Sequence, residues 1–285
     1  MNPKKQNIIN AAYTLFINKG YNASSIQDIL DEAGVSKGTF YNYFTSKTQC
    51  LIAIMESIGS ELSQLRMAAA AGRPANDSQV LADQLSIRIK LNREKNLFSL
   101  YESIFYSQDE ELKEFSKLTY LKELDWIASR IADVFGNEAK PYALDNAAAL
   151  HGSIQQLFHL WKVTSHEVLP TDELASFVVR RLEVNMAHQI ASGDRFIRET
   201  GLYPKKHAEN LSPNDLGAQL ESFSKSVADD DTTAQLVAFL GSELQSDKPR
   251  KVLIESVLGT VANKSGHEAE LLAMLEQVWK QLAKL

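Results

Sequence analysis

The chain of 285 residues has almost no cysteine and no long apolar run. Cys50 is the single cysteine, so no disulfide can form within the chain, and this usage fits a reducing cytoplasm. No uninterrupted apolar segment reaches the roughly 18 residues that a membrane span needs. An amphipathic helical pattern, and not the apolar run of a signal peptide, follows the first residues. We therefore expect a soluble, cytoplasmic protein that contacts no membrane, with Cys50 as a small core residue.

Signals of enzymatic chemistry are missing as well. The six histidines show neither H-x-x-x-H nor H-E-x-x-H spacing, and Cys50 has no C-x-x-C partner. G-x-S-x-G, P-loop and dinucleotide-binding fingerprints do not occur. We expect no catalytic residues, no metal and no cofactor. An all-α metabolic enzyme is the alternative that these absences leave open.

Strand signals are also lacking, because no sustained alternation of apolar and polar residues is bounded by turn residues. Helical spacing of apolar residues recurs along the whole chain instead, which predicts an all-α fold. The expected helices begin at Asn2 or Pro3, Ser24, Ser36, Ser46, Asp77, about Leu97, Asp109, Pro141 and Pro170, and then span 213–227, 232–244, 248–261 and 268–285.

Residues 24–47 have the pattern of two short helices joined by a glycine turn. Ser24 is predicted to cap the first helix, with Gln27 completing a capping box. Gly34 can adopt a positive φ, which ends one helix and turns the chain sharply into the next. Ser36 is expected to cap the second helix, whose apolar side carries Phe40 and Phe44. These features predict a helix-turn-helix.

The remaining surface of the second helix is suited to nucleic acid. Its side chains donate hydrogen bonds that can reach phosphates or base edges, and Gly38 lets the backbone approach a duplex closely. Ser25 lies at the start of the preceding helix, where free N–H groups favour an anion. The candidate DNA-binding residues are Ser25, Ser36, Lys37, Gly38, Thr39, Tyr41, Asn42, Tyr43 and Lys47.

The stretch from Asn7 to Leu51 resembles the DNA-binding domain of the TetR family of bacterial one-component regulators. The strongest part is the run from Ala33 to Tyr41, AGVSKGTFY, in register with Phe44 and Lys47. The detailed match covers only about the first fifth of the chain, and the remainder is similar to the family in helical layout alone. The resemblance implies a sequence-specific, DNA-binding transcriptional regulator and a role in DNA contact for the residues named above.

The distribution of charge agrees with this reading. Residues 1–50 contain five lysines and three acidic residues, a net charge of +2, whereas the whole chain carries −6, so that the rest carries −8. A basic head on an acidic body is expected of a DNA reader with a separate regulatory domain. We predict a helix-turn-helix domain over 1–48, a helical effector-binding and dimerisation domain over 49–192, and a helical C-terminal extension over 193–285.

The helices predicted over 141–165 and 170–191 carry wider apolar arcs than one core can use. The family resemblance implies that the same helix pair of a second subunit covers them in a four-helix bundle. A two-fold dimer would read a palindromic operator with one recognition helix per chain. The alternative is a monomer in which the C-terminal segment buries both helices.

The resemblance also implies a small-molecule effector that binds inside the helical domain and reorients the DNA-binding heads. Aromatic residues gather in the matching region, although such stripes are more often core than pocket. Glu102 and His151 are possible polar anchors. The candidate ligand-binding residues are Phe98, Tyr101, Glu102, Phe105, Tyr120, Trp126, His151 and Phe158.

The extension over 193–285 departs from the family, whose compact members would end near Ala191. Its helices could form a small subdomain, dock on the dimer or recruit a partner. Two functions therefore compete. The first is a ligand-responsive repressor that an apolar or aromatic effector releases from DNA. The alternative is a DNA-binding activator or interaction platform whose C-terminal helices recruit a protein.

Overall fold

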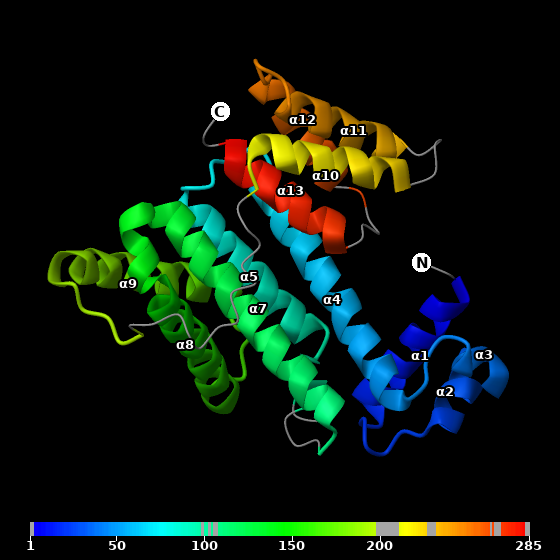
Figure 1. Ribbon diagram of the computed structural model, residues 1–285. Helices are drawn as coiled ribbons and strands as arrows, with labels where there is room; N and C mark the ends of the chain where they lie inside the picture. The colour runs from blue at the N-terminus through cyan, green and yellow to red at the C-terminus, as the bar shows by residue number, and fades with distance from the viewer. Residues whose placement is uncertain are drawn as a thin grey trace. The chain divides into compact units, whose positions relative to one another are not determined.

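The computed structural model describes residues 3–97, 100–101, 104, 108–197, 211–226, 232–262, 264 and 269–282. Every regular element within these residues is a helix, which confirms the all-α prediction (Figure 1). The elements are α1 (Pro3–Asn18), α2 (Ile26–Ala33), α3 (Lys37–Tyr41), α4 (Lys47–Ala70), α5 (Ser78–Glu94), α7 (Glu110–Phe135), the 3-10 helix η1 (Asn137–Tyr142), α8 (Ala143–Thr164), α9 (Thr171–Ser192), α10 (Pro213–Ser226), α11 (Thr232–Leu244), α12 (Lys251–Ala262) and α13 (Ala269–Leu282).

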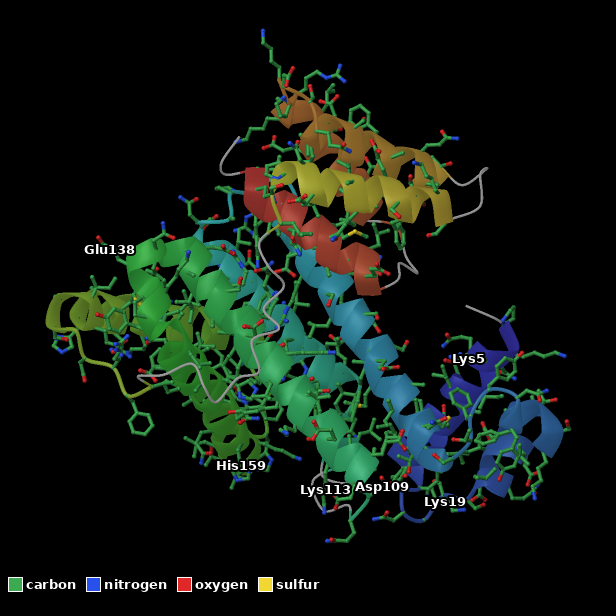
Figure 2. All side chains as sticks on the ribbon, viewed as in Figure 1. Lys5, Lys19, Asp109, Lys113, Glu138 and His159 are labelled. Carbon is green, nitrogen blue, oxygen red and sulfur yellow. The ribbon has the colours of Figure 1, made fainter. Side chains whose placement is uncertain are left out.

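Contacts divide the chain into two compact units, residues 1–62 with 88–122, and residues 63–87 with 123–285. The first unit contains α1 to α3 and the beginnings of α4 and α7. Asp109, labelled in Figure 2, caps α7 by accepting the N–H of Glu111 at 2.9 Å. The domain boundaries predicted after residues 48 and 192 remain an interpretation of the sequence.

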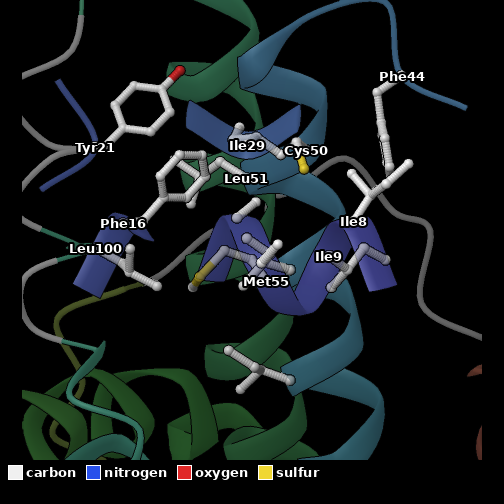
Figure 3. Packing of buried hydrophobic residues seen from close by; sticks show 14 of the residues in the cluster. Ile8, Ile9, Phe16, Tyr21, Ile29, Phe44, Cys50, Leu51, Met55 and Leu100 are labelled. Atoms are coloured by element: carbon white, nitrogen blue, oxygen red, sulfur yellow. The ribbon is translucent and has the colours of Figure 1, made fainter. Parts of the chain in front are cut away.

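One hydrophobic core holds the first unit together (Figure 3). Phe16 of α1, Ile29 of α2, Phe40 of α3 and Leu51 of α4 are almost wholly buried in it. Cys50 lies in the same core, as predicted, and burial raises the pKa of its thiol to about 12. The thiol is therefore protonated at neutral pH and is not a reactive thiolate.

The second unit contains η1, α8 and α9, and the four helices of the C-terminal extension. Helices α10 to α13 share a core with Met67 and Ala70 of α4 and Val80 of α5. Their bounds lie close to the predicted ones, and the shared core makes α10 to α13 a folded subdomain within the second unit. Helices α10 and α11 cross closely, because a Cβ on Gly217 would lie 2.7 Å from the backbone oxygen of Gly241.

Most predicted helix ends agree with the structure. Ser46 caps α4 by accepting the N–H of Gln49 at 3.0 Å, and α9 ends at Gly193 with a φ of 71°. Pro141 was expected to open a helix, but it lies inside η1 and α8 begins two residues later. Much of the helix expected to begin about Leu97 falls outside the described residues.

Candidate nucleic-acid interface

Helix α2 begins one residue later than the sequence pattern predicted. Ser25, not Ser24, is its N-cap and forms a capping box with Asp28, so that the predicted pair of Ser24 and Gln27 is wrong. The Ser24 hydroxyl is buried and donates to the carbonyl of Gly20 at 2.8 Å. Lys19 lies 2.9 Å from the Asp28 carboxylate and, with the bonds from Ser25, holds the pKa of Asp28 well below its usual range.

Gly34 makes the turn of the helix-turn-helix. Its φ of 62° is left-handed, and its N–H donates to the carbonyl of Asp31. The next N–H, that of Val35, donates to the carbonyl of Leu30 at 3.1 Å. This pair of bonds satisfies carbonyls at the end of α2 and fixes the direction in which α3 leaves. The predicted role of Gly34 is confirmed.

Helix α3 is short and is anchored on one side by Phe40, which is wholly buried. The Ser36 hydroxyl caps it by accepting the N–H of Thr39 at 3.2 Å, and the two hydroxyls of this pair lie 3.0 Å apart. Thr39 and Tyr43 are half-buried, and Tyr43 packs against the core. The exposed candidates on α3 and at its end are Lys37, Gly38, Tyr41 and Asn42.

Gly38 is not required to be glycine by the fold of the chain itself. It lies inside α3 with a helical backbone, and a Cβ built on it would meet nothing closer than the Ser36 hydroxyl at 3.9 Å. Glycine inside a helix is less stable than alanine by about 0.5–1 kcal/mol. Glycine at an exposed helical position, in spite of this cost, fits the close approach of another molecule.

The Lys47 side chain forms hydrogen bonds within the DNA-binding head. Its ammonium donates to the carbonyls of Tyr21 and Ser24, each at 2.8 Å, and lies 4.3 Å from the centre of the Tyr21 ring. Partial burial lowers the pKa of this amine. Lys47 thus ties the start of α4 to the segment before α2. Pairing at such a distance in sequence is a contact that spacing alone could not reveal.

The candidate effector residues are spread over both units. Phe98, Glu102 and Phe105 lie outside the described residues. In the first unit, Tyr101 packs against the core and Tyr120 is 48% exposed. In the second unit His151 is buried and Phe158 half-buried, whereas Trp126 packs its ring against the guanidinium of Arg66 at 3.5 Å. Their role in ligand binding remains a prediction.

A groove of about 300 Å³ lies between α8 and α9. Its floor is apolar and includes Leu150, Val178 and Leu182, and Asn146 and Arg181 contribute polar atoms to its walls. Phe177 lines it and is 39% exposed. This groove follows the two helices whose apolar arcs were predicted to be too wide for one core.

No cluster of His, Cys, Asp and Glu side chains in the described part of the chain could hold a metal ion. None of the helices that the structure describes is both long and apolar enough to cross a membrane.

Comparison with known proteins points to the same function as the geometry of the head. Residues 8–54 match the family model described as bacterial regulatory proteins, tetR family. The chain is 26% identical over 287 residues to the uncharacterized HTH-type transcriptional regulator YerO of Bacillus subtilis, and the match covers 96% of this chain and 95% of YerO. It is 27% identical over 202 residues to the regulator YuxN of the same organism, covering 64% of this chain and 63% of YuxN.

The family match ends within α4, and the likeness to YerO continues through the C-terminal helices. The helix-turn-helix, the turn at Gly34 and the exposed residues of α3 all lie inside the matched region. Residues 8–54 therefore form a DNA-binding domain of the TetR family, and the comparisons support a DNA-binding transcriptional regulator of the TetR type, not an enzyme.

Proposed function

We propose that the protein is a cytoplasmic homodimeric repressor that binds a palindromic operator and leaves it when a small, largely apolar or aromatic effector binds. The exposed face of α3 is assigned to the major groove of the operator. Lys37 and Thr39 are assigned to base edges, and Tyr41, Asn42 and Tyr43 to phosphates, with Ser25 and Ser36 at the helix starts. The methyl group of Thr39 suits a thymine, because its hydroxyl is already paired with Ser36.

The observation that carries the DNA-binding assignment is the exposed glycine at position 38, which the chain's own packing does not require. Gly38→Ala is therefore the most direct test. We expect this variant to melt at the same or a higher temperature, because alanine favours the helix. Operator binding, measured by fluorescence anisotropy, should weaken, since the added methyl group would meet the duplex. Unchanged affinity would contradict the assignment of α3 to DNA.

The groove between α8 and α9 supports the dimer. Phe177 is an exposed aromatic side chain on its wall, and Leu150 and Leu182 leave an apolar floor. A second copy of the same groove, related by a two-fold axis, would bury these residues. Phe177→Asp should shift the protein towards monomer in sedimentation velocity. Val184→Asp is the matched control, because Val184 is 66% exposed on α9 but does not line the groove.

The effector is proposed to bind among the predicted ligand-binding residues of the second unit, of which Trp126, His151 and Phe158 are described. A pocket rich in aromatic rings favours an apolar or aromatic ligand with one or two polar groups. A panel of such compounds, screened for loss of operator binding, tests this part. The expected hit lowers operator affinity without being chemically changed, which mass spectrometry of the recovered compound would establish.

The alternative is an activator or interaction platform that recruits a protein through the C-terminal helices. One observation favours this alternative. The apolar side chains of Val252 and Leu253 on α12 are 74% and 40% exposed, next to Lys251, and could contact a partner protein. The repressor is preferred since the extension shares its core with α4 and α5. A reporter gene placed under the operator separates the two. Expression rises on deletion of the regulator if it represses and falls if it activates.

A further inference from the structure

Helix α13 joins the C-terminal subdomain to the rest of the second unit. Leu275 and Val278 lie in the core formed with α10 to α12, and the same core reaches Met67 and Ala70 at the end of α4. Figure 1 shows α13, in red, beside the C-terminal end of α4. The extension is therefore built onto the last turns of α4.

Trp279 of α13 makes the central contact with the segment that follows α4. Its side chain is 2% exposed, and its indole N–H donates to the carbonyl of Arg73 at 2.8 Å. The guanidinium of Arg130 lies 4.6 Å from the centre of the indole ring. A buried indole that has both a hydrogen-bond partner and a cation on its face has little freedom to reorient.

Arg130 connects this indole to α5 and α7. The residue is fully buried, and its guanidinium donates to Gln84 at 3.1 Å, to Asp133 at 2.8 Å and to the carbonyl of Ala75 at 2.9 Å. At the edge of this group of polar contacts, the ammonium of Lys280 on α13 lies 3.6 Å from the same Asp133 carboxylate. The Arg130 guanidinium is thus paired with a carboxylate, and its N–H donors have defined acceptors.

The polar chain continues to α4 itself. The Gln84 amide donates to the carbonyl of Arg66 at 3.1 Å, and the Arg66 guanidinium pairs with both oxygens of Glu123 at 2.7 and 3.1 Å. Buried ion pairs add little net stability, because desolvation offsets much of their attraction. What such a network does provide is one preferred arrangement of the groups that it joins. This network therefore fixes the end of α4 relative to α13.

The other end of the same helix belongs to the DNA-binding head. Helix α4 is continuous from Lys47 to Ala70, and the Lys47 ammonium is bonded to the carbonyls of Tyr21 and Ser24. We propose that the C-terminal subdomain sets operator affinity through α4, with Trp279 as a positioning residue. This inference rests on the proposed function. It makes the extension a second input to DNA binding, in addition to the effector.

The test compares specific and random DNA. Trp279→Phe keeps an aromatic ring but removes the donor to Arg73. Binding to two half-sites requires a fixed arrangement of α4, whereas random DNA is held by phosphate contacts of each head. We expect the variant to bind operator at least about fivefold more weakly, the low end of allosteric coupling factors. Its affinity for random DNA should be unchanged.

Ile254→Val is the matched control, because Ile254 is buried in the subdomain core on α12 and makes no hydrogen bond to the α4–α5 segment. It should lower the melting temperature and leave operator affinity unchanged. Lys280→Gln, at the edge of the network, provides a variant that folds if Trp279→Phe does not, and it should weaken operator binding in the same direction. If both α13 variants bind operator as the wild type does, the positioning role is overturned. If the wild type itself prefers no sequence, the proposed function fails instead.

Discussion

The hydroxyl of Thr48 donates a 2.7 Å hydrogen bond to the carboxylate of Asp109, although the two residues are 61 positions apart. The Tyr21 hydroxyl lies 3.2 Å from the same Thr48 oxygen, so that Tyr21, Thr48 and Asp109 form a chain of hydrogen bonds. Asp109 also caps α7. The segment before α2, the start of α4 and the start of α7 thus meet at one buried hydroxyl.

This arrangement predicts a measurable contribution of Thr48 to stability. Thr48→Val keeps the shape of the side chain but removes the donor to Asp109 and the partner of Tyr21. Hydrogen bonds to charged groups contribute about 1.5–3 kcal/mol, so urea unfolding should show a loss of this order. Thr45→Val, at an exposed position nearby, should change stability by no more than about 0.5 kcal/mol. Equal behaviour of the two variants would contradict the role of the chain of bonds.

The capping box of α2 predicts a dependence on pH. The pKa of Asp28 is lowered in the folded protein, first by Lys19, so its carboxylate stabilises the fold above its unfolded pKa of about 3.9. That contribution is lost as the pH falls below this value. Asp28→Asn should therefore melt at a lower temperature than the wild type at pH 7, and the difference should narrow as the pH falls below about 4. A difference that is constant with pH would exclude a charged cap.

Much of the head could be predicted because its signals are local. Ser36, Ser46 and the turn at Gly34 each act within four or five residues, and all three are as expected. The prediction of Ser24 as the cap of α2 was wrong, because Ser24 and Ser25 each have a polar residue three positions on and the sequence pattern does not distinguish them. In the structure Asp28 bonds Ser25 and Lys19, and the Ser24 hydroxyl bonds the carbonyl of Gly20 instead.

The rest of the chain depends on partners that are remote in sequence. In the sequence Trp279 is one apolar position of the helix predicted over 268–285, whereas in the structure its indole N–H bonds the carbonyl of Arg73, 206 residues away. Arg66 and Arg130 carried no signal at all, since a charged residue on a helix is ordinarily solvated. Trp126 was predicted to bind a ligand because it belongs to an aromatic stripe. The stripe does not reveal that its ring packs against the guanidinium of Arg66.

Lys47 allows its two roles to be measured separately. Lys47→Met removes the donors to the carbonyls of Tyr21 and Ser24, so the melting temperature of the head should fall. The sequence also assigns this ammonium to a phosphate, which predicts that the slope of log affinity against log salt falls by about 0.9. Binding titrations from 50 to 200 mM salt would measure that slope. An unchanged slope would confine Lys47 to the fold of the head.

Base reading is predicted at Lys37, which is exposed at the start of α3. Lys37→Ala should change the preferred base at one position of each half-site, at a cost of about 1–3 kcal/mol. A selection from random DNA followed by sequencing would reveal the change. Tyr41→Phe is the comparison, because loss of a phosphate contact should weaken all sequences alike. Recovery of the wild-type palindrome by the Lys37 variant would show that this lysine touches only the backbone.

The binding of the proposed effector and the binding of operator DNA must be linked by a single coupling free energy. Two recognition helices fit successive major grooves only when their separation suits the half-sites, about 34–36 Å or a multiple of it. A ligand that binds more tightly to a dimer whose recognition helices are separated by some other distance therefore weakens operator binding. A tenfold decrease in operator affinity requires only about 1.4 kcal/mol of coupling free energy. Linkage is reciprocal, so saturating operator must weaken ligand binding by the same factor. Isothermal titration of the ligand, with operator and with a scrambled duplex of equal length, measures that factor. Equal ligand affinities in the two titrations would leave a DNA binder without an inducible switch.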